Sequence, residues 1–104
     1  MRAVRCVVHG EPECLVVEAL PPPAAGAGEV LVDVAAASVN YPDVLLVRNE
    51  YQISVAPPFT PGSDFAGTIR ALGPDVAGWR TGERVCGTVF VGAFAEQVSR
   101  GRRC

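Results

Sequence analysis

The chain has 104 residues, which is the size of one domain and too short for a complete two-domain enzyme. It is 49% hydrophobic with 11 Gly and 9 Pro, a turn-rich composition that still supplies a globular core. Nine arginines and eleven acidic residues give a net charge of −2, and three of the arginines fall in the last five residues. This mildly acidic body lacks the basic face that nucleic-acid binding requires, and the basic end is interpreted as a solvated terminus.

The first elements in the chain predict a β-hairpin. Residues 2–8 and 15–20 are short runs rich in valine, and the turn-like residues 9–13 separate them. Three consecutive prolines at 21–23 then end the second run, because proline has no amide donor and a fixed φ.

The clearest strand is predicted over residues 29–39, where valines and alanines alternate between two faces. A short helix, the only one expected, follows near residues 42–48, since Pro42 suits a first helical turn and Asp43 suits the same turn electrostatically. A long proline-containing connection over 49–61 follows, of the kind that is usually functional or mobile.

Further strands are predicted at 64–72, 83–91 and 92–98, separated by glycine-containing turns. About six short strands with frequent turns favour a mainly β fold in the form of a small, partly open barrel.

The four cysteines are spread widely, at Cys6, Cys14, Cys86 and Cys104. An even count permits disulfides, but the first residues do not resemble a secretory leader, so reduced thiols in a cytoplasmic protein are expected, with a mitochondrial location left open. No apolar run reaches the roughly 18 residues of a membrane span. No cysteine pair has zinc-motif spacing, and metal binding by Cys6, His9 and Cys14 would be accidental.

Motifs for nucleotide phosphates are not evident. Gly26-Ala27-Gly28 lacks a third glycine and enters a strand instead of a helix, and the chain has no lysine for a P-loop. Polar side chains do gather in mid-chain, and they are Asn40, Tyr41, Asp43, Tyr51, Ser63 and Asp64. Taken alone, this cluster is interpreted as helix capping by Asn40 and Asp43 with ordinary loop polarity.

An ordered set of motifs carries a family resemblance. The strings are Ala27-Gly28-Glu29-Val30-Leu31-Val32, Ala37-Ser38-Val39-Asn40-Tyr41-Pro42-Asp43, Arg48-Asn49-Glu50-Tyr51, Pro61-Gly62-Ser63-Asp64-Phe65-Ala66-Gly67, Gly82-Glu83-Arg84-Val85 and Gly92-Ala93-Phe94-Ala95-Glu96. In order and spacing they resemble the N-terminal GroES-like (chaperonin-10-like) domain of the medium-chain dehydrogenase/reductase superfamily, within its zinc-independent quinone oxidoreductases. The resemblance covers residues 1–99 and implies a GroES-like fold.

The resemblance also implies hydride transfer without zinc. The zinc-dependent branch carries a cysteine where this chain has Asn40, and Gly-His-Glu where it has Gly62-Ser63-Asp64. The lobe that holds the structural zinc in that branch would follow Val85, and no such lobe is present there. The cofactor implied is NADPH, and the implied substrate is a quinone or an activated alkene such as an enone.

Site residues carried over from the resemblance are few. Asn40 and Tyr51 would lie near the cofactor, with Asn40 close to the nicotinamide ribose or the substrate. Tyr41, Asp43 and Tyr51 would line the substrate cleft, and Asp43 is equally well explained as a helix cap. Ser63 and Asp64 are interpreted as structural.

Residues 100–104 form a basic tail that matches nothing in the family pattern. The expected dinucleotide-binding Rossmann domain is missing, so we interpret the chain as truncated and expect it to be inactive alone, without tight NADPH binding. The alternative is a non-catalytic β-module that acts, if at all, by associating with another protein or with itself through exposed apolar surface.

Overall fold

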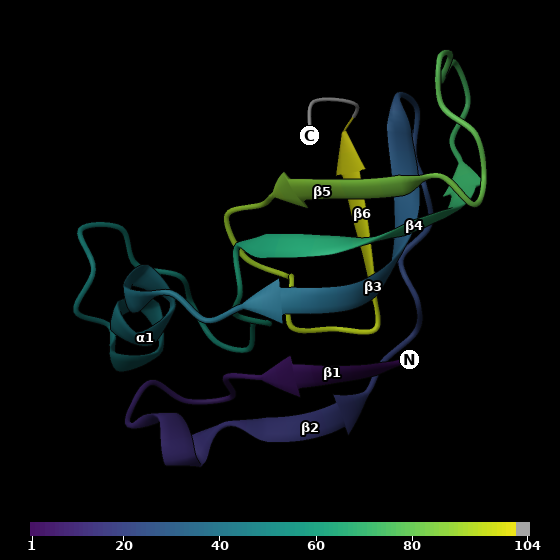
Figure 1. Ribbon diagram of the computed structural model, residues 1–104. Helices are drawn as coiled ribbons and strands as arrows, with labels where there is room; N and C mark the ends of the chain where they lie inside the picture. Colours follow the sequence, from purple (N-terminus) through teal and green to yellow (C-terminus); the bar gives the residue numbers. More distant parts are fainter. Residues whose placement is uncertain (102–104) are drawn as a thin grey trace.

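The computed structural model describes residues 1–101, which form two antiparallel sheets and one α-helix (Figure 1). The small sheet pairs β1 with β2, and the large sheet runs in the order β5-β4-β3-β6. In chain order the elements are β1 (Arg2–Arg5), the single-turn 3-10 helix η1 (Pro12–Cys14), β2 (Val16–Ala19), β3 (Glu29–Ser38), α1 (Tyr41–Arg48), β4 (Asp64–Leu72), β5 (Arg84–Thr88) and β6 (Gln97–Gly101). The prediction of a mainly β, partly open architecture with one short α-helix is confirmed; η1 was not predicted.

Strand β3 is the centre of the large sheet. It pairs with β4 along residues 30–38 and with β6 along residues 29–33. Two register shifts interrupt the pairing with β4, between Leu31 and Val32 and between Val34 and Ala36. Extra residues of this kind bend a strand and increase its twist, and Figure 1 shows β3 curving away from β6 toward α1.

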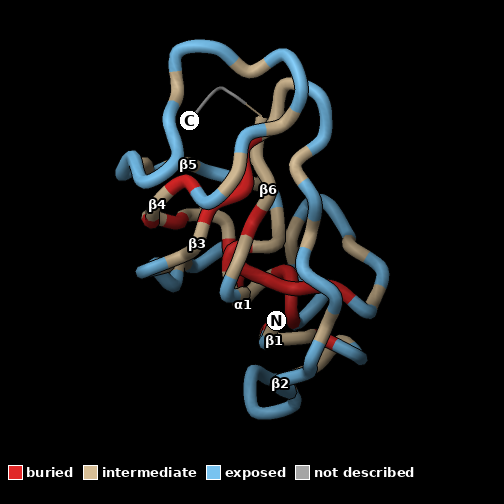
Figure 2. The backbone as a smooth tube through the Cα atoms, turned by 90° about the vertical axis from the view of Figure 1, so that its right-hand side faces the viewer, coloured by how far each residue is buried: buried red, intermediate tan, exposed pale blue. Residues whose placement is uncertain are grey.

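The core divides into two clusters, which Figure 2 shows as red stretches of the backbone tube. The first lies on the large sheet and comprises Val30, Val32, Phe65, Ile69, Ala93 and Val98. The second lies under α1 and comprises Cys6, Leu46, Val47 and Phe59. Two alternating valines of β3 belong to the first cluster, and two neighbouring residues of α1 belong to the second. The two-residue alternation of a strand and the turn of a helix thus each place apolar side chains in the core.

The strand predicted at residues 92–98 is wrong in position. Residues 94–96 instead lie against β1, where the Val4 amide donates to the Phe94 carbonyl at 2.8 Å. β6 therefore begins at Gln97 and continues through Arg100 and Gly101, which were expected in the basic tail. The predicted strand at 83–91 is likewise shorter, ending at Thr88. The rest of the tail, residues 102–104, lies outside the described residues.

Three cysteines in the described part of the chain, Cys6, Cys14 and Cys86, are free, as expected; Cys104 lies outside it. Cys6 is buried, which raises the pKa of its thiol, and its Sγ donates to the Val8 carbonyl at 3.3 Å. Among residues 1–101, no helix is both long and apolar enough to cross a bilayer.

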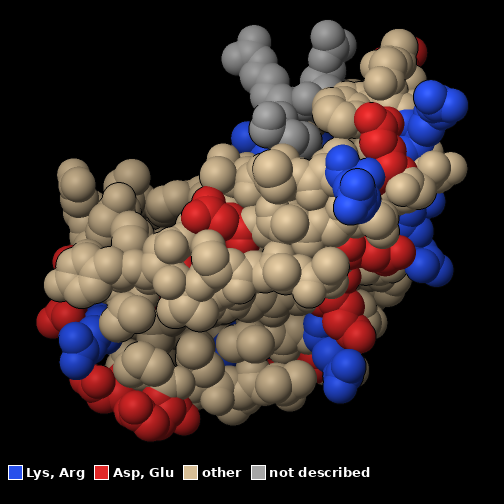
Figure 3. Space-filling view, viewed as in Figure 1, with Lys and Arg blue, Asp and Glu red and all other residues tan. Residues whose placement is uncertain are grey.

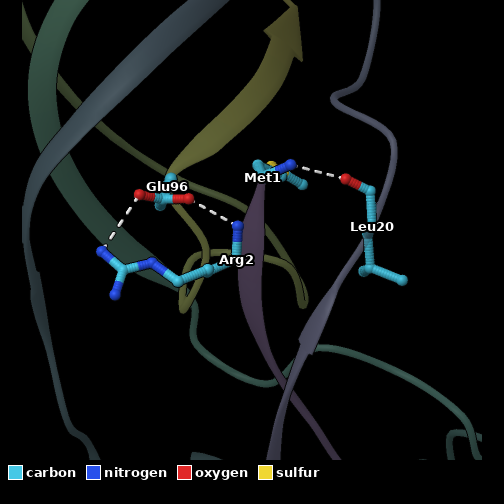
Figure 4. A network of polar contacts seen from close by, with 4 residues as sticks. All are labelled: Met1, Arg2, Leu20 and Glu96. Carbon is cyan, nitrogen blue, oxygen red and sulfur yellow. Dashed lines mark hydrogen bonds and ion pairs between the residues drawn. The ribbon is translucent and has the colours of Figure 1, made fainter.

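Polar contacts at the first two residues close the N-terminal hairpin and attach it to the residue that precedes β6 (Figure 4). The Met1 ammonium donates to the Leu20 carbonyl at 2.6 Å. The backbone amide and the guanidinium of Arg2 both donate to the Glu96 carboxylate, the guanidinium at 3.3 Å. Both hydrogen bonds lower the pKa of Glu96 below its ordinary value, and the bond from the Arg2 backbone amide has the larger effect.

We expect Glu96→Gln to weaken the acid sensitivity of the fold. Because the folded pKa of Glu96 is depressed, its contribution to stability is present at neutral pH and is lost as the pH falls through that pKa. The urea midpoint of the parent chain should therefore fall more steeply below about pH 4.5 than that of Glu96→Gln. Glu13→Gln, which changes an exposed carboxylate elsewhere, is the control and should keep the parent's acid slope. An unchanged slope in Glu96→Gln would contradict the expectation.

Candidate functional site

The candidate site lies where β3 ends, α1 begins and β4 begins. Ser38 is the last residue of β3 and stands directly opposite Asp64, the first residue of β4. Asn40 follows Ser38 by two residues and is the N-cap of α1. The β3–β4 register thus places next to one another side chains that are 26 positions apart in the sequence.

These three side chains form one hydrogen-bond network. The Asn40 Nδ2 donates to Asp64 Oδ2 at 2.8 Å and to Ser38 Oγ at 3.3 Å. The Ser38 hydroxyl in turn donates to Asp64 Oδ2 at 3.3 Å. All three residues are at least partly accessible to solvent, so the network can meet a ligand.

Asp43 lies on the other side of Asn40, inside the first turn of α1. It is only 3% exposed, and its Oδ2 accepts the Asn40 backbone amide at 2.8 Å, which is half of a capping box. Its Oδ1 has no hydrogen-bond partner among the described residues. Asp43 also borders a cavity of about 150 Å³ whose other lining residues are apolar or proline. The structure therefore shows Asp43 capping α1, and a role in substrate binding stays a prediction.

The two tyrosines lie at opposite ends of α1. Tyr41 is the first residue of the helix and is 74% exposed, immediately beside Asn40. Tyr51 follows the helix and packs against the second core cluster, half-buried. Because α1 has eight residues, roughly 12 Å of helix separates its two ends. The structure thus brings Tyr41 to Asn40 and leaves Tyr51 beyond the far end of α1.

A shallow groove runs beside the network. Its volume is about 240 Å³, and it is lined by Ala36, Ala37, Ser38, Asp64, Phe65 and Ala66. Alanine side chains leave room above the sheet, and Asp64 places a carboxylate at the groove. On the face shown in Figure 3, charged side chains gather mainly along the lower-left and right-hand margins, and the middle is largely uncharged.

The segment that leads into β4 requires a glycine before Ser63. Gly62 has φ +102°, and a Cβ there would lie 2.5 Å from a ring carbon of Phe94. Glycine adopts this conformation without strain and lets the Phe94 ring approach the backbone. Gly62 thereby sets the path on which Asp64 enters the sheet opposite Ser38.

The donor set of the network does not suit zinc. It offers one carboxylate, one amide and one hydroxyl, whereas zinc sites are built from several Cys, His or carboxylate ligands. In the part of the chain that the structure describes, no three His, Cys, Asp or Glu side chains come close enough to hold a metal ion. A ring nitrogen of His9 instead lies 2.8 Å from the Val55 carbonyl.

Sequence reasoning missed Ser38 and gave Asp64 only a structural role. Both residues are ordinary members of strands in the sequence, and the signal that joins them is the strand register, which local patterns do not contain. The helix-start pattern predicted Asn40 as a cap of α1, and the family resemblance added it to the candidate site.

The chain is similar to proteins of one family. The model of the alcohol dehydrogenase GroES-like domain matches residues 26–103. Among curated proteins, quinone oxidoreductase-like protein 2 of Mus musculus is 38% identical over 96 residues, covering 92% of this chain and 27% of that protein. Quinone oxidoreductase of Rattus norvegicus is 37% identical over 98 residues, covering 92% of this chain and 30% of that protein.

Solved structures agree with this similarity. A probable oxidoreductase from Mycobacterium abscessus superposes with a TM-score of 0.91 at 40% identity, covering 97% of this chain and 32% of that one. The quinone oxidoreductase from Thermus thermophilus, whose NADPH complex is also solved, superposes with a TM-score of 0.82 at 30% identity, covering 98% and 30%. The chain thus spans under a third of the length of these relatives.

Proposed function

Because the chain belongs to the alcohol dehydrogenase GroES-like domain family, we propose that it forms the substrate side of an NADPH-dependent oxidoreductase that reduces quinones or activated alkenes without zinc. The observation that supports the proposal is the Ser38–Asn40–Asp64 network. Two of its residues, Asn40 and Asp64, are at positions where, by the resemblance, the zinc-dependent branch carries the Cys and the Glu of Gly-His-Glu. A network of amide, hydroxyl and single carboxylate binds by hydrogen bonds and is not a zinc ligand set.

The described residues fit one end of the cofactor. Asn40 and Asp64 offer polar atoms for the sugar next to the nicotinamide, and the alanine-lined groove leaves space beside them. In residues 1–101 no glycine-rich turn opens a helix, so the phosphates would be held outside the described residues. When bound, NADPH supplies the hydride.

The chain's own residues would orient and shield the reactants. Tyr41, exposed beside Asn40, can present its ring and its hydroxyl to a planar acceptor. Tyr51, at the far end of α1, can do the same from the loop that follows the helix. Each tyrosine hydroxyl can donate to a quinone carbonyl, which positions the acceptor for transfer.

We expect the chain alone not to accelerate NADPH oxidation by 1,4-benzoquinone, because it holds only the substrate side. A chimera that joins this chain to the remaining two thirds of the rat relative is expected to turn over, and a chelator should leave its rate unchanged. The measurement is NADPH absorbance, with circular dichroism to verify folding. A folded chimera without activity, or one inhibited by the chelator, would overturn the proposal.

Cytoplasmic location and self-association both stay predictions. Self-association would use exposed apolar side chains, of which Val39 and Tyr41 are the most exposed, each at 74%.

A further inference from the structure

The cavity beside Asp43 is separate from the groove at the candidate site, and the two have no lining residue in common. It lies between α1 and η1. Val47 and Pro61, which are buried, line it, and so do Pro12 and Val39, which are exposed. Because Val47 belongs to the second core cluster, the cavity reaches from the surface toward that cluster.

The size and walls of this cavity fit one aromatic ring. Its volume is about 150 Å³, and an apolar cavity of about that volume takes a benzene molecule. Among the described residues that line it, Asp43 alone has a polar side chain, and the Phe94 ring forms part of the wall. The cavity therefore favours an aromatic group that brings few polar atoms.

Asp43 adds one hydrogen-bond acceptor to these apolar walls. Its Oδ2 accepts the Asn40 backbone amide at 2.8 Å, whereas Oδ1 is buried and has no partner among the described residues. A buried acceptor without a donor is unfavourable, above all on a carboxylate. An aromatic ring with a single O–H meets this need, since a ligand with more donors would leave the others unpaired against apolar walls.

Tyr41 carries such a ring on the same turn of α1 as Asp43. Its side chain ends in one hydroxyl, and it is 74% exposed. It is not among the residues that line the cavity, so it does not fill the cavity of its own chain. The second of the chain's two tyrosines, Tyr51, is half-buried against the second core cluster. Tyr41 is therefore the tyrosine that is available to another molecule.

We propose that two copies of this chain associate about a twofold axis, each inserting Tyr41 into the other's cavity, where the phenol hydroxyl donates to Asp43 Oδ1. Because Tyr41 and the cavity lie on the same turn of α1, one rotation seats both rings, and such a contact closes at two copies. A buried tyrosine that fills a pocket is a typical anchor of a protein interface.

Charge and position also suit a second copy at this face. Between residues 34 and 47 the only charged residue is Asp43, which is buried, so this part of the face brings no like charges together. The phenol hydroxyl and the carboxylate form a charge-assisted hydrogen bond. In Figure 1, α1 lies at one end of the molecule, where a second copy can approach it. The inference deepens the self-association predicted above and does not depend on the oxidoreductase activity.

The first experiment is sedimentation equilibrium of the full chain, which is expected to show monomers and dimers. Tyr41→Phe keeps the ring and removes the hydroxyl, so its dissociation constant is expected to rise about tenfold. Tyr51→Phe removes the same hydroxyl from the other tyrosine and should keep the parent's value. A parent that stays monomeric at millimolar concentration, or that forms species larger than dimers, would overturn the inference, as would equal dissociation constants for Tyr41→Phe and the parent.

Removal of the whole ring is the second comparison. Tyr41→Ala is expected to raise the dissociation constant by about a hundredfold or more, because the anchor is lost. Ile53→Ala is the control, since Ile53 is also exposed, at 56%, but lies on the loop after α1. Circular dichroism verifies that each variant is folded. Equal weakening by Tyr41→Ala and Ile53→Ala would show that the contact is not specific to Tyr41 and would contradict the proposal.

The third experiment locates the contact. In a mixture of carbon-13-labelled and unlabelled chains, isotope-filtered NMR spectra are expected to show Overhauser effects from the Tyr41 ring of one copy to the Val44 and Val47 methyl groups of the other. A dimer with Overhauser effects only at other residues would overturn the inference. None of these experiments contains NADPH or a quinone, so a monomeric chain would leave the proposed oxidoreductase function standing, and an inactive chimera would leave the dimer standing.

Discussion

Gly67→Ala is expected to destabilise the chain by about 3 kcal/mol or more, because the new Cβ would collide with the backbone of the neighbouring strand. A Cβ at Gly67 would lie 2.0 Å from the Asp33 carbonyl oxygen and 3.0 Å from a methyl carbon of Val32. The carbonyl belongs to β3, which is paired on both sides at Asp33, so it cannot move away without breaking sheet hydrogen bonds.

The measurement is the urea midpoint, or the loss of a dispersed NMR spectrum if the variant does not fold. Gly10→Ala is the matched control, since its Cβ would make only an ordinary contact, 3.8 Å from Cys14 Sγ. That control is expected to change stability by less than about 1 kcal/mol. A Gly67→Ala variant as stable as Gly10→Ala would show that β3 and β4 are not paired as described.

Phe65→Ala is expected to lower the free energy of unfolding by about 3–5 kcal/mol, the range for deleting a buried phenylalanine ring. Phe65 is 3% exposed and belongs to the first core cluster, where it packs with the valines of β3. Its removal leaves a cavity in the first core cluster, and it also widens the groove beside Asp64.

Phe90→Ala provides the comparison, because the Phe90 ring is 50% exposed and outside both core clusters. In the same denaturation experiment, the free energy of unfolding of Phe90→Ala should fall by less than about 1 kcal/mol. Similar losses in the two variants would contradict the assignment of the core to the β3–β4 face.

Local patterns were sufficient for the elements whose partners lie nearby or whose periodicity is regular. The hairpin of β1 and β2, the alternation of β3 and the start of α1 at Asn40 each have a signal within about ten residues. They were predicted because a strand that buries one face needs alternation, and a helix that starts at Asn40 needs a cap and tolerates proline in its first turn.

The features that were not predicted depend on contacts between segments that are distant in the sequence. The apolar run from Gly92 does not itself reveal that Ala95 bridges to Ala3, so the last strand was predicted too early. For the same reason Ser38 was missed and Asp64 was given only a structural role, since their meeting depends on a register set by two β-bulges. For Asp43, the helix-start pattern predicted capping and the resemblance implied a place in the substrate cleft. The hydrogen bond from the Asn40 amide shows the capping role, and the cleft role stays a prediction.

The uneven pairing of β3 has a consequence for how the site can be observed. Residues 30–33 are held by strands on both sides, whereas residues 34–38, which lead to the site, have a paired strand only in β4. Local opening of the second segment breaks fewer hydrogen bonds than opening of the first, so its amide protons exchange sooner. A ligand that bridges Ser38 and Asp64 joins the ends of β3 and β4 and slows that exchange. Amide exchange along this half-strand therefore reports occupancy of the site without any turnover.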